Sequence, residues 1–190
     1  MIELLETIKI EDGQVKNIEW HNQRCNKSRF ELFKEKSPLN LLNFIEPPQK
    51  GLYRCRILYD KKVNLVEYIP YSPKKINSLK IVQSNIDYNY KYNDRTELNS
   101  LLQEGYDEII IEKNGLLTDT SIANIAFYNG DVWLTPTKPL LKGTMREKLL
   151  SEKFLIRKNI KSDNIKEFSH FALMNAMIGF QIHKSINIKL

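Results

Sequence analysis

Short apolar segments separated by tight-turn dipeptides are the feature that most limits how this chain can fold. The clearest case is Asn129-Gly130, which stands between apolar segments at residues 122–128 and 132–134. Asn-Gly suits a hairpin turn because both residues tolerate positive φ angles. A second such dipeptide, Asn114-Gly115, follows a segment at 108–112 whose centre is three isoleucines. The sequence therefore predicts buried strands joined by tight turns.

The other segments predict a mixture of strands and helices. Further strands are expected at residues 2–10, 79–84, 171–174 and 180–188, with a hairpin of 52–59 and 63–69. Helices are expected at 21–33, from Ser37-Pro38, and behind two capping-box patterns that begin at Asp94 and Thr144. The weakest seam lies at residues 85–90. We therefore predict an α+β fold of two small halves, 1–86 and 87–190.

Composition places the chain among ordinary globular proteins. Of its 190 residues, 42% are hydrophobic and 27% are charged, which argues against wholesale disorder. Two cysteines, Cys25 and Cys55, cannot build a secreted disulfide framework, and reduced thiols are expected. There is no signal-peptide pattern and no apolar run long enough for a membrane span. We expect a cytoplasmic protein.

Common catalytic and metal-binding motifs are missing from the sequence. It contains no GxGxxG, Walker A, GxSxG or CxxC pattern. His21 and Cys25 stand four residues apart and could share a helix face, but no third ligand has a clear spacing. No metal site is therefore predicted.

An ordered set of short motifs carries the functional information. The set runs through His21-x-x-Arg24, Lys91-x-x-x-Arg95, Asp119-x-x-x-x-Asn124, Thr135-Pro136, Gly143-Thr144-Met145-Arg146 and Asn175-Ala176. In this order it resembles the fold-type IV pyridoxal-phosphate enzymes, among them branched-chain and D-amino-acid aminotransferases and 4-amino-4-deoxychorismate lyase. The resemblance covers almost the whole chain. It implies the class IV aminotransferase (D-amino-acid-aminotransferase-like) fold, pyridoxal 5′-phosphate (PLP) in the cleft between the halves, and a homodimer.

The resemblance also implies roles for single residues. Lys91 would be the Schiff-base lysine, which reacts only as a neutral amine and so needs a lowered pKa. Asp119, where the family usually has Glu, would face the pyridine nitrogen and keep it protonated. Arg24 would bind the cofactor phosphate with its planar fork. The plain alternatives are a solvated lysine, a turn-capping aspartate and a surface arginine, while His21 is expected to be structural.

The remaining cofactor contacts are expected from two later motifs and from Asn124. Gly143, Thr144 and Met145 open a helix, whose free N–H groups and dipole favour a phosphate. Thr144 as a simple N-cap is compatible with this role. Asn175 and Ala176 would complete the phosphate cup and border the substrate. Residues 138–166 hold nine Lys or Arg and three Asp or Glu, which is typical of a solvated helix face.

Within the family, several features favour the lyase branch. Lys91-x-x-Asp94-Arg95, Thr96 in place of the aminotransferase tyrosine, and the Gly-Thr-Met-Arg and Asn-Ala motifs all resemble the lyase more closely. The expected reaction converts 4-amino-4-deoxychorismate to 4-aminobenzoate and pyruvate, a step of folate biosynthesis. Arg54 and Arg56 could meet a substrate carboxylate, or could lie on a solvent-facing strand edge. The chain is shorter than typical members, mainly before Lys91, where the substrate pocket is expected.

Two other functions stay open. One is a class IV aminotransferase for branched-chain or D-amino acids, which would use the same cofactor and lysine. The other is a non-catalytic basic protein that binds nucleic acid, permitted by the net charge of +6. Nucleic acid is an unlikely partner, because the sequence has no RNP-like aromatic motif and no clear helix-turn-helix.

Overall fold

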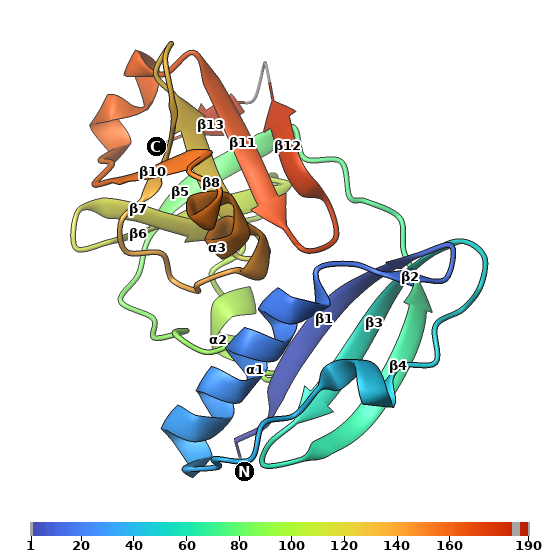
Figure 1. Ribbon diagram of the computed structural model, residues 1–190. Coiled ribbons are helices and arrows are strands. Elements are labelled where there is room, and N and C mark those ends of the chain that lie inside the picture. The colour runs from blue at the N-terminus through green and yellow to red at the C-terminus, as the bar shows by residue number, and fades with distance from the viewer. Residues whose placement is uncertain (1, 184–186, 190) are drawn as a thin grey trace. The chain divides into compact units, whose positions relative to one another are not determined.

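The protein divides into two compact units in the computed structural model, which describes residues 2–183 and 187–189 (Figure 1). Unit 1 comprises residues 2–73 and 90–94, and unit 2 comprises 74–89 and the described residues from 95 onward. This division differs from the expected boundary after residue 86, because residues 74–86 belong to unit 2 and the segment 90–94 returns to unit 1. Its backbone is held there by hydrogen bonds from Leu5 N to Lys91 O (2.9 Å) and from Asn93 N to Glu3 O (3.0 Å). Lys91, expected in the C-terminal half, therefore belongs to unit 1.

Unit 1 is an antiparallel sheet with one long helix. The sheet has the order β2-β1-β3-β4. Its strands are β1 (Leu4–Glu11), β2 (Gln14–Val15), β3 (Leu52–Tyr59) and β4 (Val63–Pro70). The helix α1 (Ile18–Phe33) and the short 3-10 helix η1 (Leu41–Phe44) lie between β2 and β3 in the chain. The predicted hairpin of β3 and β4 is confirmed by their antiparallel register.

The core of unit 1 follows from the two-residue period of β1. Leu4, Ile8 and Ile10 share one face of the strand and are fully buried, together with Cys25 of α1. Figure 1 shows α1 lying across this sheet. The same face of β1 carries Glu6, a carboxylate that is also fully buried. A charged group in this position needs a partner within the unit.

Unit 2 is a mixed sheet with strand order β10-β9-β8-β7-β6-β5-β13, to which β11 and β12 are added through β8. Three pairs are parallel (β5 with β6, β5 with β13 and β9 with β10), and the other pairs are antiparallel. The strands, in chain order, are β5 (Ser78–Gln83), β6 (Glu108–Lys113), β7 (Leu116–Thr120), β8 (Asn124–Tyr128), β9 (Trp133–Pro136), β10 (Leu155–Lys158), β11 (His170–Asn175), β12 (Gly179–His183) and β13 (Asn187–Lys189). The predicted strand at 180–188 is split between β12 and β13, and residues 184–186 lie outside the described residues.

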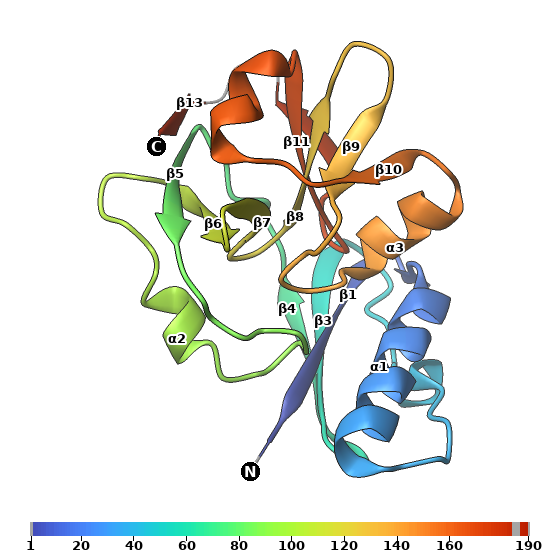
Figure 2. The ribbon, with the colours of Figure 1, turned by 90° about the vertical axis from the view of Figure 1, so that its left-hand side faces the viewer.

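Two helices of different length belong to unit 2. The helix α2 (Thr96–Asn99) has only four residues, whereas α3 (Thr144–Ser151) packs beside β10 and β11 (Figure 2). The 3-10 helix η2 (Ser162–Glu167) follows β10. The core of the sheet includes Ile110, Ile125 and Phe127, so the predicted buried isoleucine strand is confirmed.

Both predicted Asn-Gly turns are present. Asn114 and Gly115 join β6 to β7 with φ angles of 53° and 73°, the pair of positive values that a type I′ turn requires. Asn129-Gly130 lies between β8 and β9, where the Asn129 side chain accepts the N–H groups of Asp131 and Val132. Local turn chemistry alone therefore fixes these two connections.

One helix prediction was wrong at its start, whereas the helices expected behind the two capping-box patterns are present as α2 and α3. Residues 37–39 are not helical, because side chains of α1 bind their backbone: Asn26 binds both the N–H and the C=O of Leu39, and Arg29 Nη1 donates to Ser37 O (2.6 Å). The N-cap residues of these helices are, however, not Asp94 and Thr144. The N-cap of α2 is Arg95 and that of α3 is Gly143, without a side-chain cap bond in either case.

Replacement of Gly115 by alanine tests the predicted turn. A Cβ atom at Gly115 would meet nothing within 4 Å, so the cost is backbone strain alone. We expect the free energy of unfolding in urea to fall by about 1 kcal/mol, the usual cost of a left-handed conformation for a residue with a side chain. An unchanged free energy of unfolding would contradict the positive φ at this position.

Candidate active site

The turn between β7 and β8 places a buried aspartate and a buried asparagine side by side. Asp119 and Asn124 are paired residues of the two strands, and their side chains are about 95% buried or more. The turn itself is closed by Thr120, whose Oγ1 accepts the N–H groups of Ile122 (3.2 Å) and Ala123 (2.9 Å). Since Thr120 closes the turn, the alternative that Asp119 is only a turn-capping residue is wrong.

Asp119 is held through both carboxylate oxygens. Its Oδ1 accepts a hydrogen bond from Asn124 Nδ2 (2.7 Å), and its Oδ2 accepts one from Leu141 N (2.8 Å). Burial raises the pKa of Asp119 to about 6, although these hydrogen bonds and the charge of Arg146 work in the opposite direction. The carboxyl group is thus ionised at pH 7 and has lone pairs left for one further donor.

Asn124 joins the carboxylate to the start of α3. Its Nδ2 donates to Asp119 Oδ1 and to Leu141 O (2.8 Å), so both amide hydrogens are used within the protein. Its Oδ1 lies against Gly143, where an added Cβ atom would be only 2.0 Å away. Gly143 therefore has no room for a side chain, although its φ of −69° is open to any residue. The geometry makes Asn124 a residue that positions Asp119 and α3.

The first turn of α3 offers unused backbone donors. The first hydrogen bond of the helix runs from Glu147 N to Gly143 O (3.0 Å), so the N–H groups of Thr144, Met145 and Arg146 precede the helical ladder. Such a helix start favours an anion. Together with the cradle at Gly143 and the carboxylate of Asp119, these donors fit a ligand that carries both a phosphate and a protonated ring nitrogen.

Arg146 anchors this helix start, a function that the sequence did not predict. Its side chain is 1% exposed, and its Nη2 donates to Pro136 O at the end of β9 (2.8 Å). Its Nη1 binds Glu147, while its buried Nε has no hydrogen-bond partner among the described residues. The motif at 143–146 named this residue, but only the fold shows that it is buried and bound to β9.

Asn175 also serves the turn between β7 and β8. Its Nδ2 donates to Ile122 O (3.1 Å), and its Oδ1 accepts the N–H groups of Met177 (2.9 Å) and Ile178 (3.0 Å). Ala176 follows in the turn between β11 and β12. Unit 2 thus brings together the predicted residues Asp119, Asn124, Gly143, Thr144, Met145, Asn175 and Ala176.

Unit 1 holds the other predicted residues. Lys91 is half-buried, and its charge lies close enough to His21 to contribute to the lowering of the His21 pKa, for which burial is the main cause. Arg24 is held by Glu6 and is 14% exposed, so neither residue resembles a fully solvated side chain. His21 is fully buried and also binds Glu6, consistent with the structural role expected for it.

The two arginines of β3 differ in their partners. Arg56 donates to Glu67 Oε2 (2.7 Å) and to Asn93 Oδ1 (3.1 Å), which ties it to the segment that contains Lys91. The buried Nε of Arg54 has no hydrogen-bond partner among the described residues. Since β3 lies between β1 and β4, the alternative of a solvent-facing strand edge is wrong for both.

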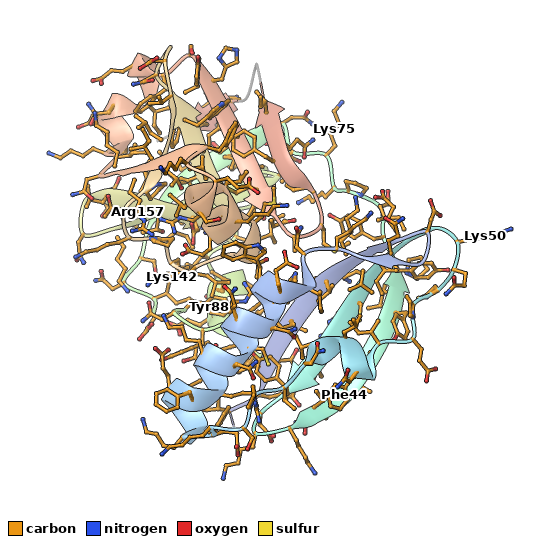
Figure 3. The ribbon with its side chains drawn as sticks, in the orientation of Figure 1. Phe44, Lys50, Lys75, Tyr88, Lys142 and Arg157 are labelled. Atoms are coloured by element: carbon orange, nitrogen blue, oxygen red, sulfur yellow. The ribbon has the colours of Figure 1, made fainter. Side chains whose placement is uncertain are left out.

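The prediction of a basic helix face at residues 138–166 is wrong. The helix α3 contains only Arg146, which is buried, and Lys148. The exposed cations lie instead in loops and on β10, where Figure 3 shows Lys142 and Arg157 extending from the surface. Around the described residues, no cluster of three or more His, Cys, Asp or Glu could hold a metal ion. In the described part of the chain, no helix has the length and apolar character needed to cross a membrane.

Comparisons with known proteins identify a family and similar structures. The profile of the family "Amino-transferase class IV" matches residues 88–186. A crystal structure from Haemophilus somnus 129pt, described as a candidate 4-amino-4-deoxychorismate lyase, is 39% identical, with 94% of this chain and 98% of that chain covered and a TM-score of 0.87. An uncharacterised protein of Haemophilus influenzae is 37% identical, over 94% of this chain and all of its own length.

The chain therefore belongs to the class IV amino-transferase family. This confirms the family, the expected fold and the expectation of an enzyme. The branched-chain amino acid aminotransferase of Escherichia coli shares the fold, with 16% identity, a TM-score of 0.74, and 97% of this chain and 76% of that chain covered. Since the two Haemophilus proteins are matched over nearly their whole length, the short form of the fold is shared with them.

Replacement of Gly143 by alanine tests the contact with Asn124. The new Cβ atom would clash with Asn124 Oδ1, so we expect the free energy of unfolding to fall by about 1–3 kcal/mol, the usual cost of overpacking. In an Asn124→Ala background the same replacement should cost less, because the clashing oxygen is gone. Equal costs in both backgrounds would show that the two residues are independent.

The pKa of Asp119 can be measured directly. We expect the ¹³C resonance of its carboxyl group, assigned with the Asp119→Asn variant, to titrate near pH 6. Because this pKa is above the ordinary value of 3.8, the folded state binds the proton more tightly than the unfolded state. The contribution of Asp119 to the free energy of unfolding should therefore fall as the pH rises from about 4 to about 6. A midpoint near pH 4 would contradict the buried environment.

Proposed function

We propose that this protein is a PLP-dependent lyase that converts 4-amino-4-deoxychorismate to 4-aminobenzoate and pyruvate. The observation that carries the proposal is the network around Asn124, which joins a buried carboxylate to the open start of a helix. A ring nitrogen and a phosphate are the two polar ends of PLP. Support for the lyase comes from the Haemophilus somnus protein, described as a candidate for this activity, and from the motifs that resemble the lyase branch.

In this proposal the residues of unit 2 bind and orient the cofactor. Asp119, ionised at pH 7, accepts the N–H of the pyridine ring and keeps it protonated. The N–H groups at the start of α3, from Thr144 and Met145, bind the phosphate. Gly143 lets it approach the backbone, and Asn175 and Ala176 border it. Asn124 contributes indirectly, through the carboxylate and helix that it positions.

The residues of unit 1 supply the reactive amine and further anion contacts. Lys91 would hold PLP through its side-chain amine, and the same amine would move the proton at the substrate α-carbon. When bound, PLP withdraws electrons from that carbon. Arg24 is proposed to bind the phosphate. Of the two arginines on β3, Arg54 is the better candidate for a substrate carboxylate, because the guanidinium of Arg56 already binds Glu67 and Asn93.

The second candidate is an aminotransferase, which the name of the matching family favours. It would use the same residues to hold PLP, and it would convert an amino acid to a keto acid. The homodimer, the small amino substrate and the cytoplasmic location remain predictions that rest on the resemblance and the sequence. The nucleic-acid alternative has no support beyond the exposed basic residues.

Borohydride reduction of the protein loaded with PLP tests the assignment of Lys91. Before reduction, we expect the loaded protein to show an absorbance band of bound PLP near the visible region. After reduction, we expect a single modified peptide, the one that contains Lys91. Lys91→Ala should abolish both the band and the modified peptide. Lys50→Ala is a matched control, because Lys50 is an exposed loop residue of the same unit (Figure 3). Label spread over surface lysines, or no band at all, would contradict PLP as the cofactor.

Product analysis then separates the two enzymes. The lyase should release equal amounts of 4-aminobenzoate and pyruvate from 4-amino-4-deoxychorismate. A loaded protein that releases neither, and that yields keto acids from L- or D-amino acids with accumulation of the pyridoxamine form, would instead be an aminotransferase.

A further inference from the structure

Glu6 is a fully buried carboxylate on the apolar face of β1. It stands between Leu4 and Ile8, both at 0% exposure, on the strand face that α1 covers. Burying an ionised carboxylate costs several kcal/mol unless charged or hydrogen-bonding partners compensate it. The contacts of Glu6 therefore show which groups compensate its charge.

Arg24 and His21, one turn apart on α1, both bind Glu6. Arg24 Nε donates to Oε1 (2.8 Å), and Arg24 Nη2 donates to Oε2 (2.6 Å), which makes a two-point fork. His21 Nδ1 lies 2.6 Å from Oε2. Burial would raise the pKa of Glu6, but the charge of Arg24 and the hydrogen bonds from His21 and Arg24 lower this pKa to about 2. Glu6 is thus ionised throughout the physiological range.

His21 acts in this cluster as a neutral donor. Burial lowers its pKa, which outweighs the opposing effect of Glu6, so the imidazole carries one proton. The 2.6 Å contact with a carboxylate assigns that proton to Nδ1. Its Nε2 is buried and has no hydrogen-bond partner among the described residues. The charges of the cluster are therefore those of one guanidinium and one carboxylate.

The fork fixes one edge of the Arg24 guanidinium and leaves the other edge available. A guanidinium has five N–H groups, and Glu6 uses the one on Nε and one of the two on Nη2. Of the remaining three, one on Nη1 and one on Nη2 point in parallel from the end of the guanidinium, and this pair matches two oxygens of a phosphate. The side chain is 14% exposed, so part of it reaches the surface of the unit.

We propose that Glu6, assisted by His21, is a positioning residue that sets the orientation of Arg24 for one phosphate monoester of the cofactor. This inference rests on the proposed function, in which Arg24 binds the phosphate of PLP. The charge of Arg24 and its orientation lead to opposite predictions for phosphate binding after the Glu6 carboxylate is removed. If only charge mattered, removal of the Glu6 carboxylate would strengthen phosphate binding, because it leaves Arg24 unneutralised. If orientation matters, the same change weakens it.

Equilibrium titrations with PLP and with pyridoxal, which lacks the phosphate, separate these effects. We expect Glu6→Gln to weaken PLP binding by about tenfold, as is usual when a residue behind a ligand-binding group is removed. The affinity for pyridoxal should stay within about twofold. Arg24→Lys keeps the charge but cannot form the fork, and it should lose PLP affinity in the same selective way. Glu31→Gln is the matched control, since it removes an exposed carboxylate of the same helix, and it should behave as wild type.

The inference is overturned if Glu6→Gln binds PLP as tightly as wild type or more tightly, or if it loses PLP and pyridoxal affinity equally. Should that variant not fold, Arg24→Lys decides: wild-type affinity for PLP in it overturns the inference, and a selective loss supports it. A wild-type protein that binds no PLP would contradict the proposed function itself. A wild type that binds PLP, with Glu6→Gln unchanged, would contradict only the role of Glu6.

Discussion

The side-chain amide of Asn124 is the contact on which the arrangement of unit 2 depends. It satisfies a buried carboxylate and a loop carbonyl with its two hydrogens, and its oxygen fills the space that a side chain at residue 143 would need. A buried carboxylate without such donors would be protonated or displaced. One short polar side chain therefore links the end of β7, the loop before α3 and the N-cap residue of that helix.

Unit 1 also contains a buried carboxylate, but a different kind of group compensates it. Its buried carboxylate, Glu6, is compensated by a guanidinium instead of by amide donors, so its pKa is lowered, whereas that of Asp119 is raised. The difference has a physical cause. Arg24 brings a full charge to Glu6, while Asp119 receives neutral donors and only the more distant charge of Arg146. Both carboxylates are nevertheless ionised at pH 7.

Local sequence patterns predicted the elements whose cause is local. The two Asn-Gly turns, the alternating hairpin of β3 and β4 and the buried strand β6 formed as expected, because a turn or a two-residue period involves only neighbouring residues. The helix predicted at Ser37-Pro38 failed because Asn26 and Arg29, distant in sequence, bind that backbone. The helices behind the two capping-box patterns are present, and their N-caps, Arg95 and Gly143, each lie one residue from the expected position.

By itself, the sequence determined the family of this protein, since the order of its motifs indicated the family that the comparisons then showed. It also determined which residues are candidates for its chemistry. Tertiary structure decided what surrounds each of them: that Asn124 supports Asp119, that Arg146 is buried, that Lys91 joins unit 1, and that Glu6 holds Arg24. The reason is physical, because burial and hydrogen-bond partners depend on residues far apart in the chain, and these set the ionisation and orientation of each side chain.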